Sequence, residues 1–213
     1  MRCDSCYGDI HPVVLVDIDG TLAEYHDALT EFVNHYFDLP LVKYAWNGEG
    51  DFEDYFGITQ EQYREAKLAF RQGGMKRSMA VYPYVNRFMQ DLSRVASVWL
   101  TTTRPWQRLD NVDPDTREWL RRNNIQYDGL LYDEFKYSKI LDIIDRDRIV
   151  GVIEDLPEQY DHAEEMGLPV FQVVRLHNSH PTQQRPTRGT LPTATAWVNR
   201  NLTEWRNRNE SRS

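Results

Sequence analysis

The stretch VVLVDIDGTL, at residues 13–22, decides the fold. Its first four residues are apolar and mostly β-branched, which predicts a short buried strand. The strand leads directly into two carboxylates, Asp17 and Asp19, and Gly20 allows the chain to turn sharply away. Because ligands of open parallel sheets bind at the carboxyl ends of the strands, we expect Asp17 and Asp19 to belong to a ligand site.

Four further short apolar runs follow this strand. They span residues 95–100, 130–132, 149–153 and 170–174. Segments with helical spacing separate the later runs, and Ser138 and Pro157 are placed to begin two of these helices. The alternation of strands and helices predicts an α/β fold in which helices cover a parallel sheet.

Residues 22–81 interrupt the alternation because they contain no convincing strand. Their apolar residues recur at helical spacing, and Thr59 and Gln62 form a candidate capping box. The segment also holds 11 of the 26 aromatic residues. We therefore expect a small helical cap inserted after the first strand. The expected domains are a core of residues 1–21 and 82–177, the cap at 22–81, and a polar linker with a C-terminal helix at 178–213.

Charge is unevenly distributed along the 213 residues, whose formal net charge is −8. From Arg175 onward there are seven Arg and two Glu, a net charge of +5, so residues 1–174 carry −13. An acidic body is a poor platform for nucleic-acid phosphates and suits cations better. The longest apolar run is far shorter than the ~20 residues of a membrane span, and the N-terminus does not resemble a signal peptide. We expect no membrane partner and a cytoplasmic location.

The two cysteines, Cys3 and Cys6, form a lone CxxC pair with His11 nearby. A structural zinc site requires four nitrogen or sulfur ligands, and the chain has no second CxxC pair. A plain reduced N-terminus is therefore the first interpretation, with a redox pair and a zinc site as the alternatives.

A second pair of acidic residues follows a later strand. Glu154 and Asp155 come directly after the run at 149–153, which places them at the same edge of the sheet as Asp17 and Asp19. Clustered carboxylates share a site only if a cation or a proton neutralises some of their charge. Mg²⁺ takes one or two protein carboxylates and completes its shell with water or phosphate oxygens. We therefore predict an Mg²⁺ site drawn from Asp17, Asp19, Glu154 and Asp155.

Phosphate-binding side chains follow the other strands. The second strand leads into Thr102, Thr103 and Arg104, whose hydroxyl and guanidinium groups can hold phosphoryl oxygens. Lys136 and Lys139 flank the start of the next predicted helix and add positive charge. Each feature is common by itself, but all of them occur in order at successive strand ends. The set predicts a site for phosphoryl chemistry.

These residues resemble the motifs of the haloacid dehalogenase superfamily of phosphatases, over about residues 13–174. The matches, in order, are Asp17 and Asp19 to the DxDGT motif, Thr102 to the strand-end Thr or Ser, Lys136 or Lys139 to the third-motif lysine, and Glu154 and Asp155 to the acidic fourth motif. Lys136 is the favoured lysine, because it precedes the helix and apolar residues follow it at roughly the family's spacing. The resemblance implies a Rossmann-like sheet with helices on both faces and a cap after the first strand.

The charges predict a mechanism in which Asp17 attacks phosphorus and forms an aspartyl-phosphate. Mg²⁺ is expected to bind the Asp17 carboxylate, the Asp19 backbone carbonyl and Asp155, with Glu154 acting through water. Asp19, protonated in its acidic surroundings, is expected to give a proton to the leaving oxygen and then to take one from the attacking water. Thr102 and the third-motif lysine are expected to hold the phosphoryl oxygens.

The expected substrate is a small phosphorylated molecule of the nucleoside monophosphate type. The cap is similar to that of 5'(3')-deoxyribonucleotidases, and the stretch after Glu154 resembles the phosphatase half of polynucleotide kinase/phosphatases. In the cap, Trp46 and Lys76 are candidate substrate contacts, since an aromatic ring can stack on a base. The alternatives are a phosphatase for a polynucleotide 3' end or another phosphoester, and a non-catalytic module that senses metal or phosphate.

Overall fold

The computed structural model describes residues 11–40 and 43–211. Cys3 and Cys6 lie outside the described residues. Within these ranges, six parallel strands form one sheet in the order β3-β2-β1-β4-β5-β6. The strands are β1 (Val13–Val16), β2 (Ser97–Thr102), β3 (Gly129–Tyr132), β4 (Ile149–Glu154), β5 (Val170–Val173) and β6 (Arg188–Gly189). The predicted α/β fold with a Rossmann-like parallel sheet is confirmed.

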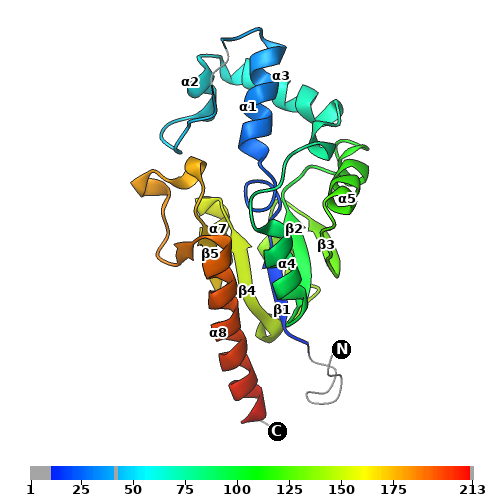
Figure 1. Cartoon of the computed structure of the whole chain (residues 1–213), viewed down its shortest axis with the longest axis vertical. Helices are drawn as coiled ribbons and strands as arrows, with labels where there is room; N and C mark the ends of the chain where they lie inside the picture. Colours follow the sequence, from blue (N-terminus) through cyan, green and yellow to red (C-terminus); the bar gives the residue numbers. More distant parts are fainter. Residues whose placement is uncertain (1–10, 41–42, 212–213) are drawn as a thin grey trace.

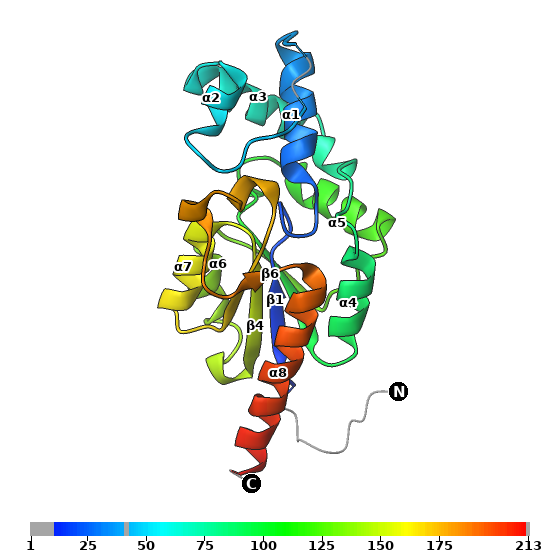
Figure 2. The ribbon, with the colours of Figure 1, turned by 60° about the vertical axis from the view of Figure 1, so that its left-hand side comes forward.

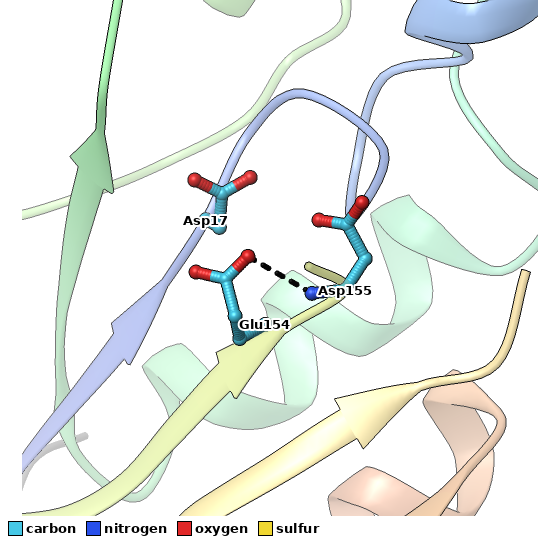
Figure 3. Close-up of side chains that lie close together, drawn as sticks. All are labelled: Asp17, Glu154 and Asp155. Atoms are coloured by element: carbon cyan, nitrogen blue, oxygen red, sulfur yellow. Dashed lines mark hydrogen bonds between the residues drawn. The ribbon is translucent and has the colours of Figure 1, made fainter. Parts of the chain in front are cut away.

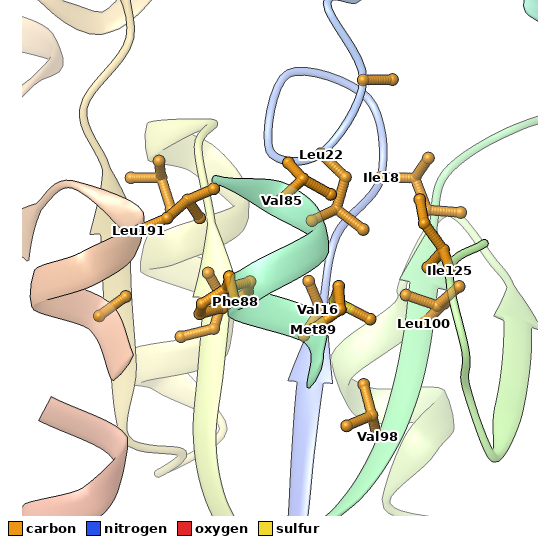
Figure 4. Close-up of a cluster of buried hydrophobic side chains, with 14 of the residues drawn as sticks. Val16, Ile18, Leu22, Val85, Phe88, Met89, Val98, Leu100, Ile125 and Leu191 are labelled. Carbon is orange, nitrogen blue, oxygen red and sulfur yellow. The ribbon is translucent and has the colours of Figure 1, made fainter. Parts of the chain in front are cut away.

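Helices cover both faces of this sheet, and Figures 1 and 2 show the two layers. The core helices are α4 (Val85–Ser93), α5 (Val112–Arg122), α6 (Lys136–Ile140), α7 (Pro157–Glu165) and α8 (Leu191–Glu210). Val14 and Val16 of β1 face a cluster that includes side chains of α4 and α8, part of which Figure 4 shows. Val13 and Leu15 face the opposite cluster, with α6 and α7. Strand β1 is therefore buried on both faces, as its continuous apolar run predicts.

The cap stands above the carboxyl edge of the sheet (Figure 1). It contains α1 (Tyr25–Tyr36), α2 (Phe52–Phe56), α3 (Gln60–Gln72) and the 3₁₀ turn η1 (Met75–Arg77). The predicted capping box is present, because Thr59 Oγ1 accepts from Gln62 N and Gln62 Oε1 accepts from Thr59 N. An antiparallel bridge between Ala23 and Val81 joins the two chain segments that connect the cap to the core.

The start of α6 differs from the prediction that Ser138 caps it. The helix begins at Lys136, and Ser138 Oγ donates to the Phe135 carbonyl from inside the first turn. The Asp133 carboxylate accepts from Phe135 N at 2.8 Å, so its side chain makes the turn that leads into the helix. This turn directs Lys136, rather than Lys139, toward the end of the sheet.

The segment after β5 is more ordered than a polar linker. It forms the 3₁₀ turns η3 (Leu176–Asn178) and η4 (Pro181–Gln183) and then the short strand β6, while another 3₁₀ turn, η2 (Arg146–Arg148), precedes β4. Asn178 Nδ2 donates to the carbonyls of Val173 and Asp155, which holds the segment against the sheet edge. Within the described ranges, none of the helices is long and apolar enough to cross a membrane.

Candidate active site

Three carboxylates meet where β1 and β4 end, as Figure 3 shows. The register that pairs Val16 with Ile153 puts Asp17, the residue after β1, beside Glu154 and Asp155. One oxygen of each carboxylate lies within 4.8 Å of the other two, and all three side chains are buried. The structure thus brings together three of the four predicted metal ligands through their side chains.

Lys136 is the cation that faces this cluster. Its Nζ lies 2.5 Å from Asp17 Oδ1 and 2.7 Å from Glu154 Oε2, and its side chain is buried. Burial alone would lower the pKa of Lys136, but Asp17 and Glu154 outweigh it and raise that pKa. Lys139 instead points to the surface, where it pairs with Asp142 at 2.9 Å. Of the two candidate lysines, the structure places Lys136 at the site and Lys139 away from it.

Glu154 is occupied by donors on both oxygens. Oε1 accepts from the backbone N–H groups of Asp155 (3.0 Å) and Leu156 (3.2 Å). Oε2 accepts from Tyr137 Oη at 2.5 Å and pairs with Lys136. A carboxylate offers about four lone-pair positions, so these four donors leave little capacity for a metal. Glu154 serves to hold Lys136 and the strand end, which leaves Asp17 and Asp155 as the side chains available to a cation.

Asp155 is held by two side chains that the sequence interpretation did not select. Thr21 Oγ1 donates to Oδ1 at 2.8 Å, and His177 Nε2 lies 2.6 Å from Oδ2. Gly20 packs so closely against Asp155 that a Cβ there would overlap its carboxylate, and the φ of Gly20 is 91°. Thr21 adjoins the DxD motif and could have been found from it. His177 is the last residue of the predicted core, directly before the predicted linker, and no sequence pattern distinguished it.

The charge of the cluster fits a divalent cation. Burial and the neighbouring Glu154 raise the pKa of both Asp17 and Asp155 well above the usual range, although Lys136 lowers both. One lysine therefore faces three buried carboxylates, and the set lacks positive charge. Hard carboxylate oxygens with space for water or phosphate are the donor set of Mg²⁺. Asp17 and Asp155 are the residues that would hold it.

Asp19 belongs to a separate group with the opposite charge balance. Arg104 donates to it through Nε (2.9 Å) and Nη2 (2.5 Å), and Lys76 Nζ of the cap donates to Oδ2. Burial would raise the pKa of Asp19, but Arg104 and Lys76 lower it well below the usual range. The expected protonation of Asp19 is therefore wrong for this arrangement. Arg104 contributes by pairing with Asp19, a role that sequence order alone does not indicate.

The remaining predicted residues differ in their distance from these two groups. Thr102 is buried at the end of β2, where its Oγ1 accepts from Arg104 N at 3.3 Å. Thr103 is exposed and lines a cavity together with Arg104. Trp46 packs inside the cap against Phe52, with ring centroids 4.8 Å apart, and its Nε1 donates to the Glu49 carbonyl. None of the described polar contacts of Trp46 reaches the carboxylates.

Comparison with known proteins identifies the class of fold. No protein-family model matches the sequence, and a search of curated proteins finds no match. Among solved structures, a predicted phosphatase from Clostridium acetobutylicum aligns with a TM-score of 0.65 at 14% identity, over 90% of this chain and 100% of that one. A haloacid dehalogenase-like hydrolase from Streptococcus pneumoniae aligns with a TM-score of 0.62 at 14% identity, over 88% and 98%.

A third neighbour, CbbY from Rhodobacter sphaeroides in complex with phosphate, has a TM-score of 0.59 at 16% identity and covers 89% of this chain and 99% of its own. An L-2-haloacid dehalogenase also has this fold, with a TM-score of 0.58 at 14% identity. The chain thus has the fold of haloacid dehalogenase-like hydrolases. Proteins named for different reactions share this fold, so the side chains of the site, and not the fold, determine the chemistry.

Proposed function

We propose that this protein is an Mg²⁺-dependent phosphomonoesterase that transfers a phosphoryl group from a small ester to Asp17 and then to water. The observation that carries the proposal is the Asp17 carboxylate held by Lys136 beside Asp155, with the Asp19 group next to it in the chain. A non-catalytic sensor would have no use for a second acid held by two cations. The phosphate bound to CbbY, which shares the fold, agrees with phosphoryl chemistry.

Each side chain then has a role in the transfer. An oxygen of Asp17 attacks phosphorus, the bond to the leaving oxygen breaks, and an aspartyl-phosphate forms. Lys136 holds Asp17 in place and balances the charge of the phosphoryl group. Thr102, at the end of β2, would bind the transferring oxygens. Mg²⁺, held by Asp17 and Asp155, would supply Lewis-acid stabilisation of the phosphoryl charge.

Proton transfer is assigned to Asp19 and Lys76 together. Asp19 is ionised in this arrangement, and burial and Arg104 lower the pKa of Lys76 to about 7. The Lys76 ammonium can pass a proton through its hydrogen bond with Asp19 to the leaving oxygen. Asp19 then accepts a proton from the water that hydrolyses the aspartyl-phosphate and passes it to Lys76 through the same hydrogen bond, which restores the ionised Asp19 and the Lys76 ammonium.

The substrate class we propose is a nucleoside monophosphate, used in the cytoplasm. The alternative, a polynucleotide 3' end, requires a basic track for the phosphate backbone. Arg175 and Arg185 of the basic C-terminal region are already engaged. Arg175 donates to the carbonyls of Gly20 and Thr21, and Arg185 pairs with Asp161. These contacts remove part of the positive surface that a polynucleotide would need, which favours the smaller substrate.

A phosphate-release assay tests this proposal. The full chain with Mg²⁺ is given nucleoside monophosphates, sugar phosphates, acetyl phosphate and a 3'-phosphorylated oligonucleotide at equal concentration, with Asp17→Asn as the control. We expect release that stops with a chelator and is fastest for nucleoside monophosphates. Faster release from the oligonucleotide would favour the alternative, and no release from any ester would refute phosphatase function.

A further inference from the structure

The aromatic side chains of the cap pack on one another and contact the segment after β5. Trp46 and Phe52 pack on each other, and the His26 ring stacks on His177 with centroids 4.0 Å apart. His180 N donates to the Asn47 carbonyl at 2.9 Å, which joins the segment after β5 to the cap loop. Trp46 thus packs within the cap, and none of its described contacts reaches the carboxylates, so we look elsewhere for the site of the leaving group.

Arg175 ties the base of the cap to the same segment. Its guanidinium donates to the carbonyls of Gly20 and Thr21 and lies 3.7 Å from the ring centroid of Tyr82. Gly20 and Thr21 lead into the cap, and Tyr82 follows the segment that leads out of it. One side chain therefore holds both connections. A cap fixed in this way favours substrate access from the side.

A cavity of about 540 Å³ adjoins the Asp19 group, because Arg104, which pairs with Asp19, is part of its lining. The loops after β2, β3 and β4 line it, together with Arg71 from the end of α3. Its lining includes Thr103, Phe135 and Leu156, which are the chain neighbours of Thr102, Lys136 and Asp155. A group attached to a phosphate at Asp17 can therefore extend directly into this cavity.

The lining combines aromatic surface with unsatisfied polar atoms. Trp106 and Phe135 are 44% and 65% exposed, unusually high for large apolar side chains. Arg71 Nε and Gln159 Oε1 are buried and have no hydrogen-bond partner within the described parts of the chain. A buried donor and a buried acceptor without partners are costly unless a ligand satisfies them. The exposed aromatic rings, the Arg71 donor and the Gln159 acceptor together suit a planar, polar ring system as the ligand.

A second and larger cavity, of about 910 Å³, lies within the cap but suits a phosphate ester poorly. It is lined by α1 and residues 75–80, and Glu24, Asp27 and Glu31 contribute three carboxylates to its wall. Its lining includes none of the chain neighbours of Asp17 or Asp155. The side cavity also has three acidic residues in its lining, but three arginines, Arg71, Arg104 and Arg108, balance them, whereas the cap cavity sets only Lys43 against its carboxylates. The side cavity is therefore the better site for an anionic substrate.

We propose that this side cavity binds the leaving group, and that the leaving group is a nucleoside whose base carries an exocyclic amino group. The inference rests on the proposed phosphatase function and specifies its substrate. The base stacks on Trp106, its amino group donates to Gln159 Oε1, and Arg71 Nε donates to an acceptor on the sugar or base. Loss of one base–aromatic stack weakens binding by about tenfold or more.

The test measures the preference for a nucleotide over acetyl phosphate, an acyl phosphate without a ring. For each variant, kcat/KM for adenosine 5'-monophosphate is divided by kcat/KM for acetyl phosphate. We expect Trp106→Ala to lower this ratio at least tenfold and Trp106→Phe to restore most of it. Tyr36→Ala is the matched control, because Tyr36 is 43% exposed on the cap and lies outside the cavity lining. It should leave the ratio unchanged.

Gln159→Met tests the amino group separately. The wild type should bind adenosine and cytidine monophosphates more tightly than inosine and uridine monophosphates, and the variant should lose this difference. Binding is measured by calorimetry in the Asp17→Asn background, so the result does not depend on turnover. An unchanged ratio in Trp106→Ala, or a tenfold loss in Trp46→Phe instead, would overturn the inference. Absence of hydrolysis of every phosphate ester and of acetyl phosphate would instead refute the proposed function.

Discussion

Two groups of charged side chains, one around Asp17 and one around Asp19, have opposite charge balances although only Ile18 separates these two residues in the chain. Asp17, with Glu154 and Asp155, gives three carboxylates facing Lys136, and all four side chains belong to the core. Asp19 is one carboxylate facing two cations, Arg104 from the core and Lys76 from the cap. The first group lacks positive charge, whereas the second has an excess of it.

In the proposed mechanism, this difference separates the two tasks of a phosphoryl transfer. A group with too few cations binds an added metal ion, and its carboxylate is free to attack once the metal and Lys136 reduce the repulsion. A group with an excess of cations attracts the substrate anion and transfers a proton to the leaving oxygen. The backbone between Asp17 and Asp19 holds the two groups together, so substitutions in each should have distinguishable effects.

Removing the nucleophile should have the largest effect. Asp17→Asn keeps the shape of the side chain but cannot form the aspartyl-phosphate, so phosphate release should fall below about one thousandth, more than about 4 kcal/mol in activation free energy. Asp19→Asn should slow turnover yet still become labelled by a phosphate ester with a good leaving group. Label appearing on Asp17→Asn would show that another residue is the nucleophile.

The two lysines test the cation of the core group. Lys136→Met leaves Asp17 and Glu154 buried without their partner, so we expect a loss of about 3 to 5 kcal/mol in unfolding free energy and at least a tenfold loss in kcat/KM. Lys139→Met is the matched control, because Lys139 forms an exposed pair with Asp142. Urea unfolding and steady-state kinetics measure both. Equal effects of the two substitutions would contradict the assignment of Lys136.

Metal binding should stabilise the core group. At a Mg²⁺ concentration about 100 times its Kd, the unfolding free energy should rise by about 2.7 kcal/mol, and chelation should abolish phosphate release. Ca²⁺ should also stabilise the fold but inhibit turnover, because its larger and looser coordination misplaces the attacking oxygen. Asp155→Asn should weaken the Mg²⁺-dependent shift in thermal unfolding, whereas Asp115→Asn, a buried acid away from the cluster that pairs with Arg77, should not. Equal shifts in both variants would place the metal elsewhere.

Much of the fold was predictable because its signals are local. The apolar runs, the capping box of α3 and the helix that begins at Pro157 each depend on residues close in sequence. The core carboxylates were predictable as well, since strand ends of a parallel sheet meet at one edge. Strand β6 was missed because two residues, Arg188 and Gly189, carry no hydrophobic pattern.

The charge state of Asp19 could not be predicted in the same way. It depends on Lys76, 57 positions away, and on Arg104, 85 positions away, which the fold alone brings to it. The nearby carboxylates visible in the sequence suggested a raised pKa, whereas the cations that face Asp19 lower it. The contact of His177 with Asp155 is also long-range and lies in a segment without a motif. The sequence around such residues does not indicate which distant residues they contact.

The smallest expected effect concerns the histidine stack that joins the core group to the cap. Burial lowers the pKa of His26 well below its ordinary value, and burial and Arg175 lower the pKa of His177 to about 3. Below about pH 6.5 the unfolded chain therefore binds protons that the folded chain does not, so these histidines make stability fall as pH falls. Each contributes a slope of at most about 1.4 kcal/mol per pH unit.

His26→Phe keeps an aromatic ring in the stack and removes a buried Nδ1 that has no partner within the described residues. We expect equal or higher stability at pH 7.5 and a shallower loss between pH 6 and pH 4, measured by urea unfolding at each pH. Tyr44→Phe is the control, because Tyr44 also stacks on His26 and does not titrate in that range. Tyr44→Phe should keep the wild-type dependence of unfolding free energy on pH. If His26→Phe shows the same dependence as the wild type and Tyr44→Phe, His26 takes up its proton in the folded protein.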